Sequence, residues 1–203
     1  MVDFTAATRI QREFRDVMKS KECADSNIKI VMLNDNYSDL RGEFLGPPDT
    51  PFAGGTFNLE IRIPDGYPFE PPKVRFTTRI WHPNISSATG AICLDILKDQ
   101  WAAAMNLRVV LLSIQGLLAS PEPDDPQDAV VAKQYKQCKP MYSDTARYWT
   151  CAYAGGPQDG FDYGTFSSKV QRMMEMGISE SNAVAQLSAY NWNLEHAIGA
   201  LFS

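Results

Sequence analysis

Apolar positions near the start of the chain recur at a helical spacing. The apolar residues, at i, i+4, i+7 and i+8, are Ile10, Phe14, Val17 and Met18. This spacing puts them on one face of an α-helix. Four basic residues stand off that stripe: Arg9, Arg12, Arg15 and Lys19. The pattern predicts an amphipathic first helix with a basic outer face.

The next part of the chain has the two-residue period of β-strands. In residues 55–63, apolar side chains alternate with polar ones, and strand-like segments also occupy residues 27–33, 40–46 and 72–81. No helical pattern intervenes, and the connectors are rich in turn-forming proline and glycine, as in "GPPDTPFAGG" and "IPDGYPFEPPK". These segments predict a four-stranded antiparallel meander.

Helical patterns return after the strands. Residues 106–119 are apolar nearly all round, which predicts a buried helix, and residues 127–153 predict two helices broken near Pro140. Strands followed by helices indicate the α+β class.

The composition changes again at Gly155. The stretch "GGPQDGFDYG" is rich in glycine and is typical of a flexible linker. Three short amphipathic stretches follow, with Ser179 and Asn193 placed to cap the second and third helices. We therefore expect a main domain over residues 1–154, a linker over 155–163 and a small all-α three-helix domain over 164–203.

Charge and composition exclude several classes of protein. The chain has 203 residues and a formal net charge of −5, so it has no general attraction to nucleic acid or to an anionic membrane. There is no signal-peptide pattern, and the longest apolar run, residues 107–120, is shorter than the roughly 20 residues that a membrane span needs. We expect an intracellular protein, in the cytoplasm and also in the nucleus.

The four cysteines lie far apart: Cys23, Cys93, Cys138 and Cys151. They form no CxxC pair and no Cys/His cluster with zinc-ligand spacing, so we expect no disulfide framework, no metal and no other cofactor.

Cys93 follows the small polar loop "SSATGA", which leaves a thiol reachable on one side. A cysteine hydrolase would pair this thiol with a histidine base, and the chain has only His82 and His196. His196 falls in the tail, and Pro83 restricts His82 to an extended or turn conformation. A structural role for His82 is favoured over a base.

A thiol that receives an already activated acyl group needs no such base, because thiol-to-thioester exchange is nearly isoenergetic. The second step of such a reaction, attack by an amine, builds negative charge on the carbonyl oxygen. An amide donor such as Asn84 can stabilise that oxyanion, and a nearby carboxylate can orient or deprotonate the amine.

Three stretches of the main domain closely resemble the ubiquitin-conjugating enzymes: "GPPDTPFAGGTFNLEIRIPDGYPFEPPKVRF", "HPNISSATGAICLDILKDQW" and "PEPDDP". The resemblance covers residues 5–154. The tail resembles a ubiquitin-associated domain, so the whole chain is similar to the 25-kilodalton class of these enzymes, which carries this domain at its C-terminus.

The resemblance assigns roles to the site residues. It implies that Cys93 accepts ubiquitin as a thioester, that Asn84 stabilises the oxyanion or holds the active-site loop, and that Asp125 orients the attacking lysine. His82 would be structural, and Asp95 would be either a second acidic neighbour or a turn-capping residue.

The resemblance also implies docking surfaces. Arg9 and Arg12 on the first helix would meet the ubiquitin-activating enzyme. Phe69 and the loop "WAAAM", with Ala103 and Ala104, would meet RING-type ligases; this loop departs from the Ser-Pro-Ala that many family members carry. Leu112 would contact the donor ubiquitin, and core packing is the competing explanation for an apolar residue there.

In the tail, the family pattern implies that ubiquitin is held by Met176, Gly177, Ile178 and Leu201. Ile178 stands where the family usually has Phe or Tyr, which predicts modest affinity.

We therefore expect a monomeric ubiquitin-conjugating enzyme that transfers ubiquitin to lysine amines and builds polyubiquitin chains of the proteasome-targeting linkage. Its close spacing to Cys93 also makes Lys98 a candidate for self-modification. The alternatives are a ubiquitin-binding adaptor in which Cys93 is incidental, and a cysteine hydrolase.

Overall fold

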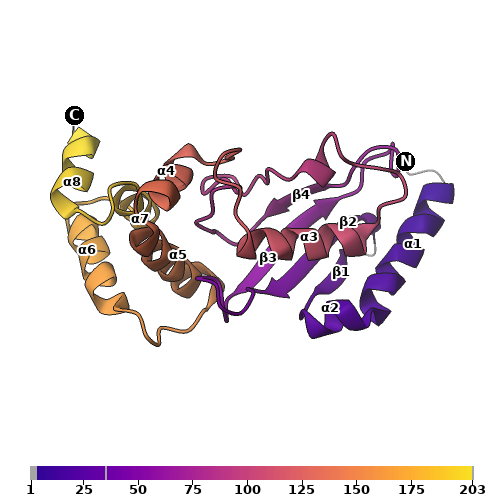
Figure 1. The fold of residues 1–203 in the computed structure, drawn as a ribbon, viewed down its shortest axis with the longest axis horizontal. Helices are drawn as coiled ribbons and strands as arrows, with labels where there is room; N and C mark the ends of the chain where they lie inside the picture. The colour runs from indigo at the N-terminus through magenta and orange to yellow at the C-terminus, as the bar shows by residue number, and fades with distance from the viewer. Residues whose placement is uncertain (1–3, 35, 203) are drawn as a thin grey trace.

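The computed structural model describes residues 4–34 and 36–202, with side chains from residue 7 onward. A four-stranded sheet lies in the middle of an elongated molecule and α3 (Leu107–Ala119) crosses one of its faces (Figure 1). The first two helices, α1 (Phe4–Lys19) and α2 (Lys21–Asp25), lie at one end, and helices α4 to α8 gather at the other.

The sheet is an antiparallel meander in the order β1-β2-β3-β4, which confirms the predicted topology. Its strands are β1 (Lys29–Leu33), β2 (Asn36–Leu45), β3 (Thr56–Arg62) and β4 (Lys73–Phe76). In β3 the alternation predicted from sequence holds, since Phe57, Leu59 and Ile61 are all buried.

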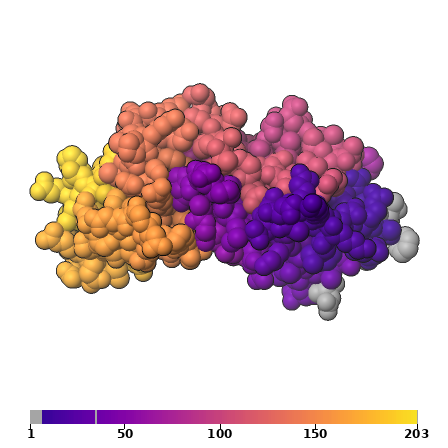
Figure 2. Space-filling model, turned by 60° about the horizontal axis from the view of Figure 1, so that its bottom comes forward, coloured from indigo at the N-terminus to yellow at the C-terminus, as the bar shows by residue number. Residues whose placement is uncertain are grey.

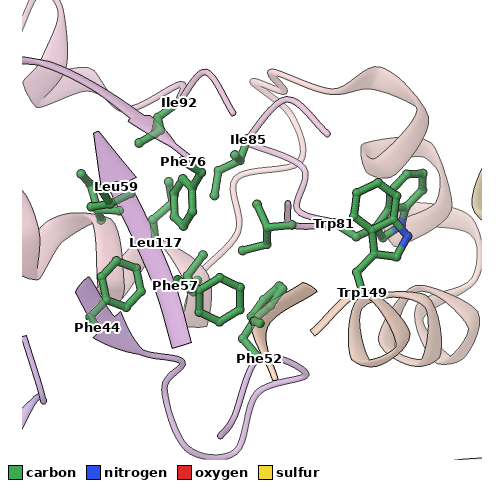
Figure 3. Packing of buried hydrophobic residues seen from close by; sticks show 14 of the residues in the cluster. Phe44, Phe52, Phe57, Leu59, Phe76, Trp81, Ile85, Ile92, Leu117 and Trp149 are labelled. Atoms are coloured by element: carbon green, nitrogen blue, oxygen red, sulfur yellow. The ribbon is translucent and has the colours of Figure 1, made fainter. Parts of the chain in front are cut away.

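Helix α3 packs closely on the sheet. Asn106 caps it by accepting a hydrogen bond from the amide of Val109, and one face buries residues such as Leu111 and Ile114. A Cβ at Gly42 would lie 3.1 Å from Leu111, so the glycine allows the helix to approach β2. Figure 3 shows the aromatic part of this core, where the rings of Phe44, Phe57 and Phe76 lie 6.1–6.3 Å apart.

Helix α1 follows the predicted apolar stripe for most of its length. Ile10 and Val17 are buried and Phe14 is half-buried. Met18 departs from the prediction because it lies at the last turn, beyond the core, and is 59% exposed. Helix α2 was not predicted: it has only five residues and begins at its N-cap Ser20.

After α3, the described part of the chain forms five helices. The break predicted near Pro140 lies at Cys138, between α4 (Ala129–Gln137) and α5 (Lys139–Ala154), and Pro140 occupies the first turn of α5, where a missing N–H costs nothing. The tail contains α6 (Tyr163–Glu175), α7 (Glu180–Ala189) and α8 (Leu194–Phe202). Ser179 and Asn193 cap the last two helices by accepting backbone amides, as predicted.

The tail helices pack against α4 and α5 through buried aromatic residues. The rings of Trp192 and Tyr148 lie 4.7 Å apart, the indole N–H of Trp192 donates to Thr145, and that of Trp149 donates to Ser188. These contacts hold α6, α7 and α8 against the main domain.

The segment between α5 and α6 also touches the main domain. The Cys151 thiol donates to the carbonyl of Pro157 at 3.0 Å, and a Cβ at Gly54 would lie 2.7 Å from the Pro157 ring. Figure 2 shows the purple segment around residue 50 next to the orange C-terminal part of the chain. Across the described residues, no helix is both long and apolar enough to span a membrane.

Candidate active site

The His-Pro-Asn stretch forms a tight turn beside the cysteine. His82 and Ile85 form an isolated β-bridge, and the amide of Cys93 donates to the carbonyl of Asn84 at 2.8 Å. The backbone of Cys93 is therefore fixed to the turn, and its side chain is half-buried at the edge of a groove.

His82 is fully buried and uses both ring nitrogens. Nδ1 accepts from the amide of Asn84, and Nε2 lies 3.0 Å from the carbonyl of Leu117, to which it donates in the tautomer that the first bond requires. Burial lowers the pKa of His82 to about 3, so the ring stays neutral. No lone pair is left for a base, and the ring instead ties the turn to α3.

The side chain of Asn84 is directed into the loop of residues 122–125. Its Nδ2 donates to the carbonyls of Glu122 and Asp125 at 2.9 and 3.0 Å, and its Oδ1 accepts from the amide of Glu122 at 2.8 Å. The residue is 1% exposed. Of the two roles expected from sequence, this geometry supports the one in which Asn84 holds the loop.

The sulfur of Cys93 lies between a cation and a carboxylate. Lys98 Nζ is 3.2 Å from Sγ, and the thiol donates to Asp125 Oδ2 at 3.6 Å. Lys98 and Asp125 are both exposed, so solvent and a substrate amine can reach the sulfur where these two side chains lie. The sulfur therefore has both a positive charge and a hydrogen-bond acceptor within 3.6 Å.

A groove of about 480 Å³ runs from Cys93 along the exposed face of α3. Three carboxylates border it, from Asp95, Glu122 and Asp125, and Ser113 and Gly116 lie on its helical wall. Asp95 is the first residue of a short 3₁₀ turn and accepts the amide of Ile96 at 2.7 Å, but the N-cap position of that turn is Leu94, so Asp95 is an acidic neighbour at the groove and not the cap.

Ser87 and Asp128, which join the loop before Cys93 to the start of α4, were not identified from sequence. Asp128 Oδ2 accepts from the amide and hydroxyl of Ser87 at 3.0 and 2.6 Å, while Oδ1 accepts from the amide of Val131 and caps α4. The position of Asp128 directly before a helical pattern signals a cap, but the link to Ser87 depends on the fold.

The expected docking residues lie in different environments. Phe69 is 85% exposed, Arg12 and Ala104 are exposed, and Ala103 is half-buried. Arg9 departs from the expected outer face: its side chain is 24% exposed and bonds internally to Glu13 and to the carbonyl of Met105. On α3, Leu112 is half-buried.

The tail residues expected to bind ubiquitin form the turn after α6 and the end of α8. Met176 is exposed and Gly177 has a φ of 85°, which favours glycine. Ile178 and Leu201 are half-buried and pack against the core. Among the described residues, no three His, Cys, Asp or Glu side chains gather in a way that could hold a metal ion.

The half-buried cysteine lies at an open acidic groove, and the neighbouring histidine ring is fully engaged, so the site fits an enzyme that receives an already activated acyl group better than it fits a cysteine hydrolase. The family model "Ubiquitin-conjugating enzyme" matches residues 9–150. The chain is 62% identical to Ubiquitin-conjugating enzyme E2-22 kDa of Drosophila melanogaster and 56% identical to Ubiquitin-conjugating enzyme E2 K of Homo sapiens, each over 98% of both chains. A solved structure of a putative ubiquitin conjugating enzyme from Plasmodium yoelii superposes with a TM-score of 0.71 and 46% identity, covering 77% of this chain and 100% of that one.

The chain therefore belongs to the ubiquitin-conjugating enzymes. It is a transferase that works through a thioester intermediate, with ubiquitin, the activating enzyme and ubiquitin ligases as its kinds of partner. These findings do not favour the adaptor interpretation, and the engaged ring of His82 disfavours a cysteine hydrolase.

Proposed function

We propose that Cys93 carries ubiquitin as the thioester and that Asp125 receives the attacking lysine. The observation that supports this most strongly is the placement of Sγ, which is fixed through the Cys93 backbone and lies 3.6 Å from Asp125 Oδ2 at the mouth of the acidic groove. A lysine approaching the thioester from solvent would meet this carboxylate, which can orient it and accept its proton.

The transfer step then uses the loop that Asn84 holds. With its side-chain amide bonded to Glu122 and Asp125, Asn84 keeps the carboxylate of Asp125 beside the sulfur. The groove along α3 begins at Cys93, so we assign it to the extended C-terminal segment of ubiquitin, with Leu112 on the same helix contacting the body of ubiquitin.

The exposed side chains on α1 and on two loops supply the proposed docking surfaces for the activating enzyme and for ligases. Arg12, on the solvent face of α1, contacts the activating enzyme, and Phe69 with Ala103 and Ala104 contacts RING-type ligases. The protein acts as a monomer in the cytoplasm and nucleus and builds chains of the proteasome-targeting linkage.

The tail is proposed to be a ubiquitin-associated domain that binds ubiquitin without a covalent bond. Two exposed apolar residues adjoin the expected binding residues in sequence: Met176 precedes Gly177, and Phe202 follows Leu201. Titration with labelled ubiquitin should show binding that Met176→Glu weakens at least about tenfold. Equal affinity in the variant would place the binding surface elsewhere.

The thioester is tested by incubating the enzyme with activating enzyme, ATP and ubiquitin. A reducible adduct should form in the wild type and in Cys151→Ala, and should be absent in Cys93→Ala. An adduct that persists in Cys93→Ala would refute the assignment.

A further inference from the structure

Helix α1 buries a carboxylate that the transfer reaction does not use. Glu13 is 2% exposed. Burying a carboxylate is costly unless hydrogen-bond donors replace the lost water. The Glu13 side chain has three: Arg9 Nε at 2.6 Å, the Tyr67 hydroxyl at 2.5 Å and the amide of Leu107 at 3.0 Å.

The three donors come from parts of the chain that are far apart in sequence. Arg9 is on α1 itself, Tyr67 lies within the turn that carries Phe69, and Leu107 is the first residue of α3, directly after the loop of residues 101–106. The Glu13 carboxylate also lies at the N-terminus of α3, where the positive end of the helix dipole stabilises a negative charge.

Arg9 extends the same network into the second loop. Its Nη2 donates to the carbonyl of Met105 at 2.8 Å, and its guanidinium carbon lies 5.5 Å from the centre of the Tyr67 ring. The residue expected to meet the activating enzyme is thus bonded mainly inside the protein. The C-terminal end of the 101–106 loop is therefore held by two hydrogen bonds, from Arg9 to the carbonyl of Met105 and from the amide of Leu107 to Glu13.

The other end of this loop is attached to the Phe69 turn. The indole N–H of Trp101 donates to the carbonyl of Pro68 at 2.8 Å, and the rings of Tyr67 and Trp101 lie 5.9 Å apart. The two loops are therefore joined at their bases while Phe69, Ala102 and Ala104 stay exposed at their tips. Burial, together with the Glu13 carboxylate, raises the pKa of Tyr67, which keeps its hydroxyl a donor.

We propose that Glu13 is a positioning residue that fixes the Phe69 turn and the 101–106 loop relative to each other, so that their tips form one preorganised ligase-docking surface. Surfaces held in the bound geometry lose less conformational entropy when a partner binds. Glu13 is buried inside the protein and acts through Tyr67, Arg9 and Leu107. The assignment of the surface to ligases rests on the proposed function, but the positioning itself does not.

The positioning is tested by amide hydrogen exchange on the whole chain. Glu13→Gln should speed exchange at least about tenfold in residues 66–70 and 101–107, because a neutral amide cannot accept from all three donors. The sheet and the tail should be unchanged. Glu43→Gln is the matched control, since it removes the surface partner of Lys29 and should leave both loops protected. Tyr67→Phe removes one bond without a charge change and serves if Glu13→Gln folds poorly.

The functional consequence is tested by lysine discharge from the preloaded thioester, with and without the RING domain that most stimulates the wild-type protein in a panel. Glu13→Gln should lower the stimulated rate at least about fivefold and leave the unstimulated rate within about twofold. Phe69→Ala should lose stimulation too, but with normal exchange in residues 101–107.

Unchanged exchange in both Glu13→Gln and Tyr67→Phe would overturn the positioning role. Equal loss of stimulated and unstimulated discharge would overturn its link to docking. If no RING domain stimulates the wild type, the assignment of the surface to ligases fails, and the exchange measurement still decides whether Glu13 positions the loops.

Discussion

The ammonium group of Lys98 lies 3.2 Å from the sulfur of Cys93. In the proposed thioester the carbonyl carbon is bonded to that sulfur, so the same amine lies within reach of the electrophile when it loses its proton. The geometry makes Lys98 an internal competitor for the ubiquitin that Cys93 carries.

Lys98→Arg should therefore abolish a slow self-modification. Loaded wild-type enzyme without an external amine should form a reductant-resistant adduct of one ubiquitin, and peptide mass spectrometry should locate the isopeptide on Lys98. Arginine keeps the charge but is not a nucleophile at neutral pH. Lys133→Arg, an exposed lysine on α4, is the control and should behave as wild type. An adduct of equal yield in Lys98→Arg would contradict the prediction.

Asn84 and Asp125 should show coupled effects on lysine discharge. Asn84 bonds the backbone of Asp125, so Asn84→Ala should displace the carboxylate and slow discharge, while loading by the activating enzyme stays near normal. If Asn84 acts through the loop, adding Asn84→Ala to Asp125→Ala should cost little more, giving a coupling energy of about 1–3 kcal/mol in a double-mutant cycle. Fully multiplicative rate losses would indicate instead that Asn84 stabilises the oxyanion directly.

His82 should make stability fall in mild acid. Its pKa is about 3 in the folded protein against an ordinary value of 6.5, so below pH 6.5 the unfolded chain takes up a proton that the folded one excludes. Each pH unit should cost about 1.4 kcal/mol, or about 2 kcal/mol between pH 6.5 and 5.

This dependence is measured by urea unfolding at pH 7 and pH 5. His82→Gln should be less stable than wild type at pH 7 but should lose about 2 kcal/mol less between the two pH values. His196→Gln removes an exposed histidine and should keep the wild-type slope. The prediction is wrong if the His82→Gln and wild-type slopes coincide.

Gly116 lies in the interior of a helix, and no steric contact within the free protein requires glycine at this position. It lies in α3 on the wall of the groove, and a Cβ there would meet no atom within 4 Å. Gly116→Ala should raise the free energy of unfolding by about 0.5–1 kcal/mol, because alanine loses less backbone entropy. Gly116→Trp should instead slow loading by narrowing the groove. Normal loading in the tryptophan variant would argue against the groove as the path of the ubiquitin tail.

Local patterns in the sequence predicted the elements of the fold well. The alternation in residues 55–63 predicted β3, and Pro140 predicted the break between α4 and α5. Ser179 caps α7, as its position before a helical pattern predicted. Each depends on neighbouring residues along the chain, which is why periodicity and capping rules find it.

Features that depend on distant contacts were missed or placed wrongly. Arg9 was assigned to the solvent face because no helical period reveals that Met105, 96 residues away, accepts its guanidinium. The burial of Glu13 likewise requires Tyr67 and Leu107. The sequence did single out Cys93, Asn84 and Asp125, but only the folded chain shows that the Asn84 amide is engaged with the loop.

The intact mass of the adduct formed by Cys93→Ser tests the central claim most directly. With activating enzyme, ATP and ubiquitin, this variant should accumulate a one-ubiquitin ester that survives reductant, is cleaved by hydroxide and maps to position 93, whereas the wild-type thioester, unlike the slow Lys98 isopeptide, is released by reductant. A Cys93→Ser adduct that reductant still removes would show that another cysteine carries ubiquitin, and would contradict the account.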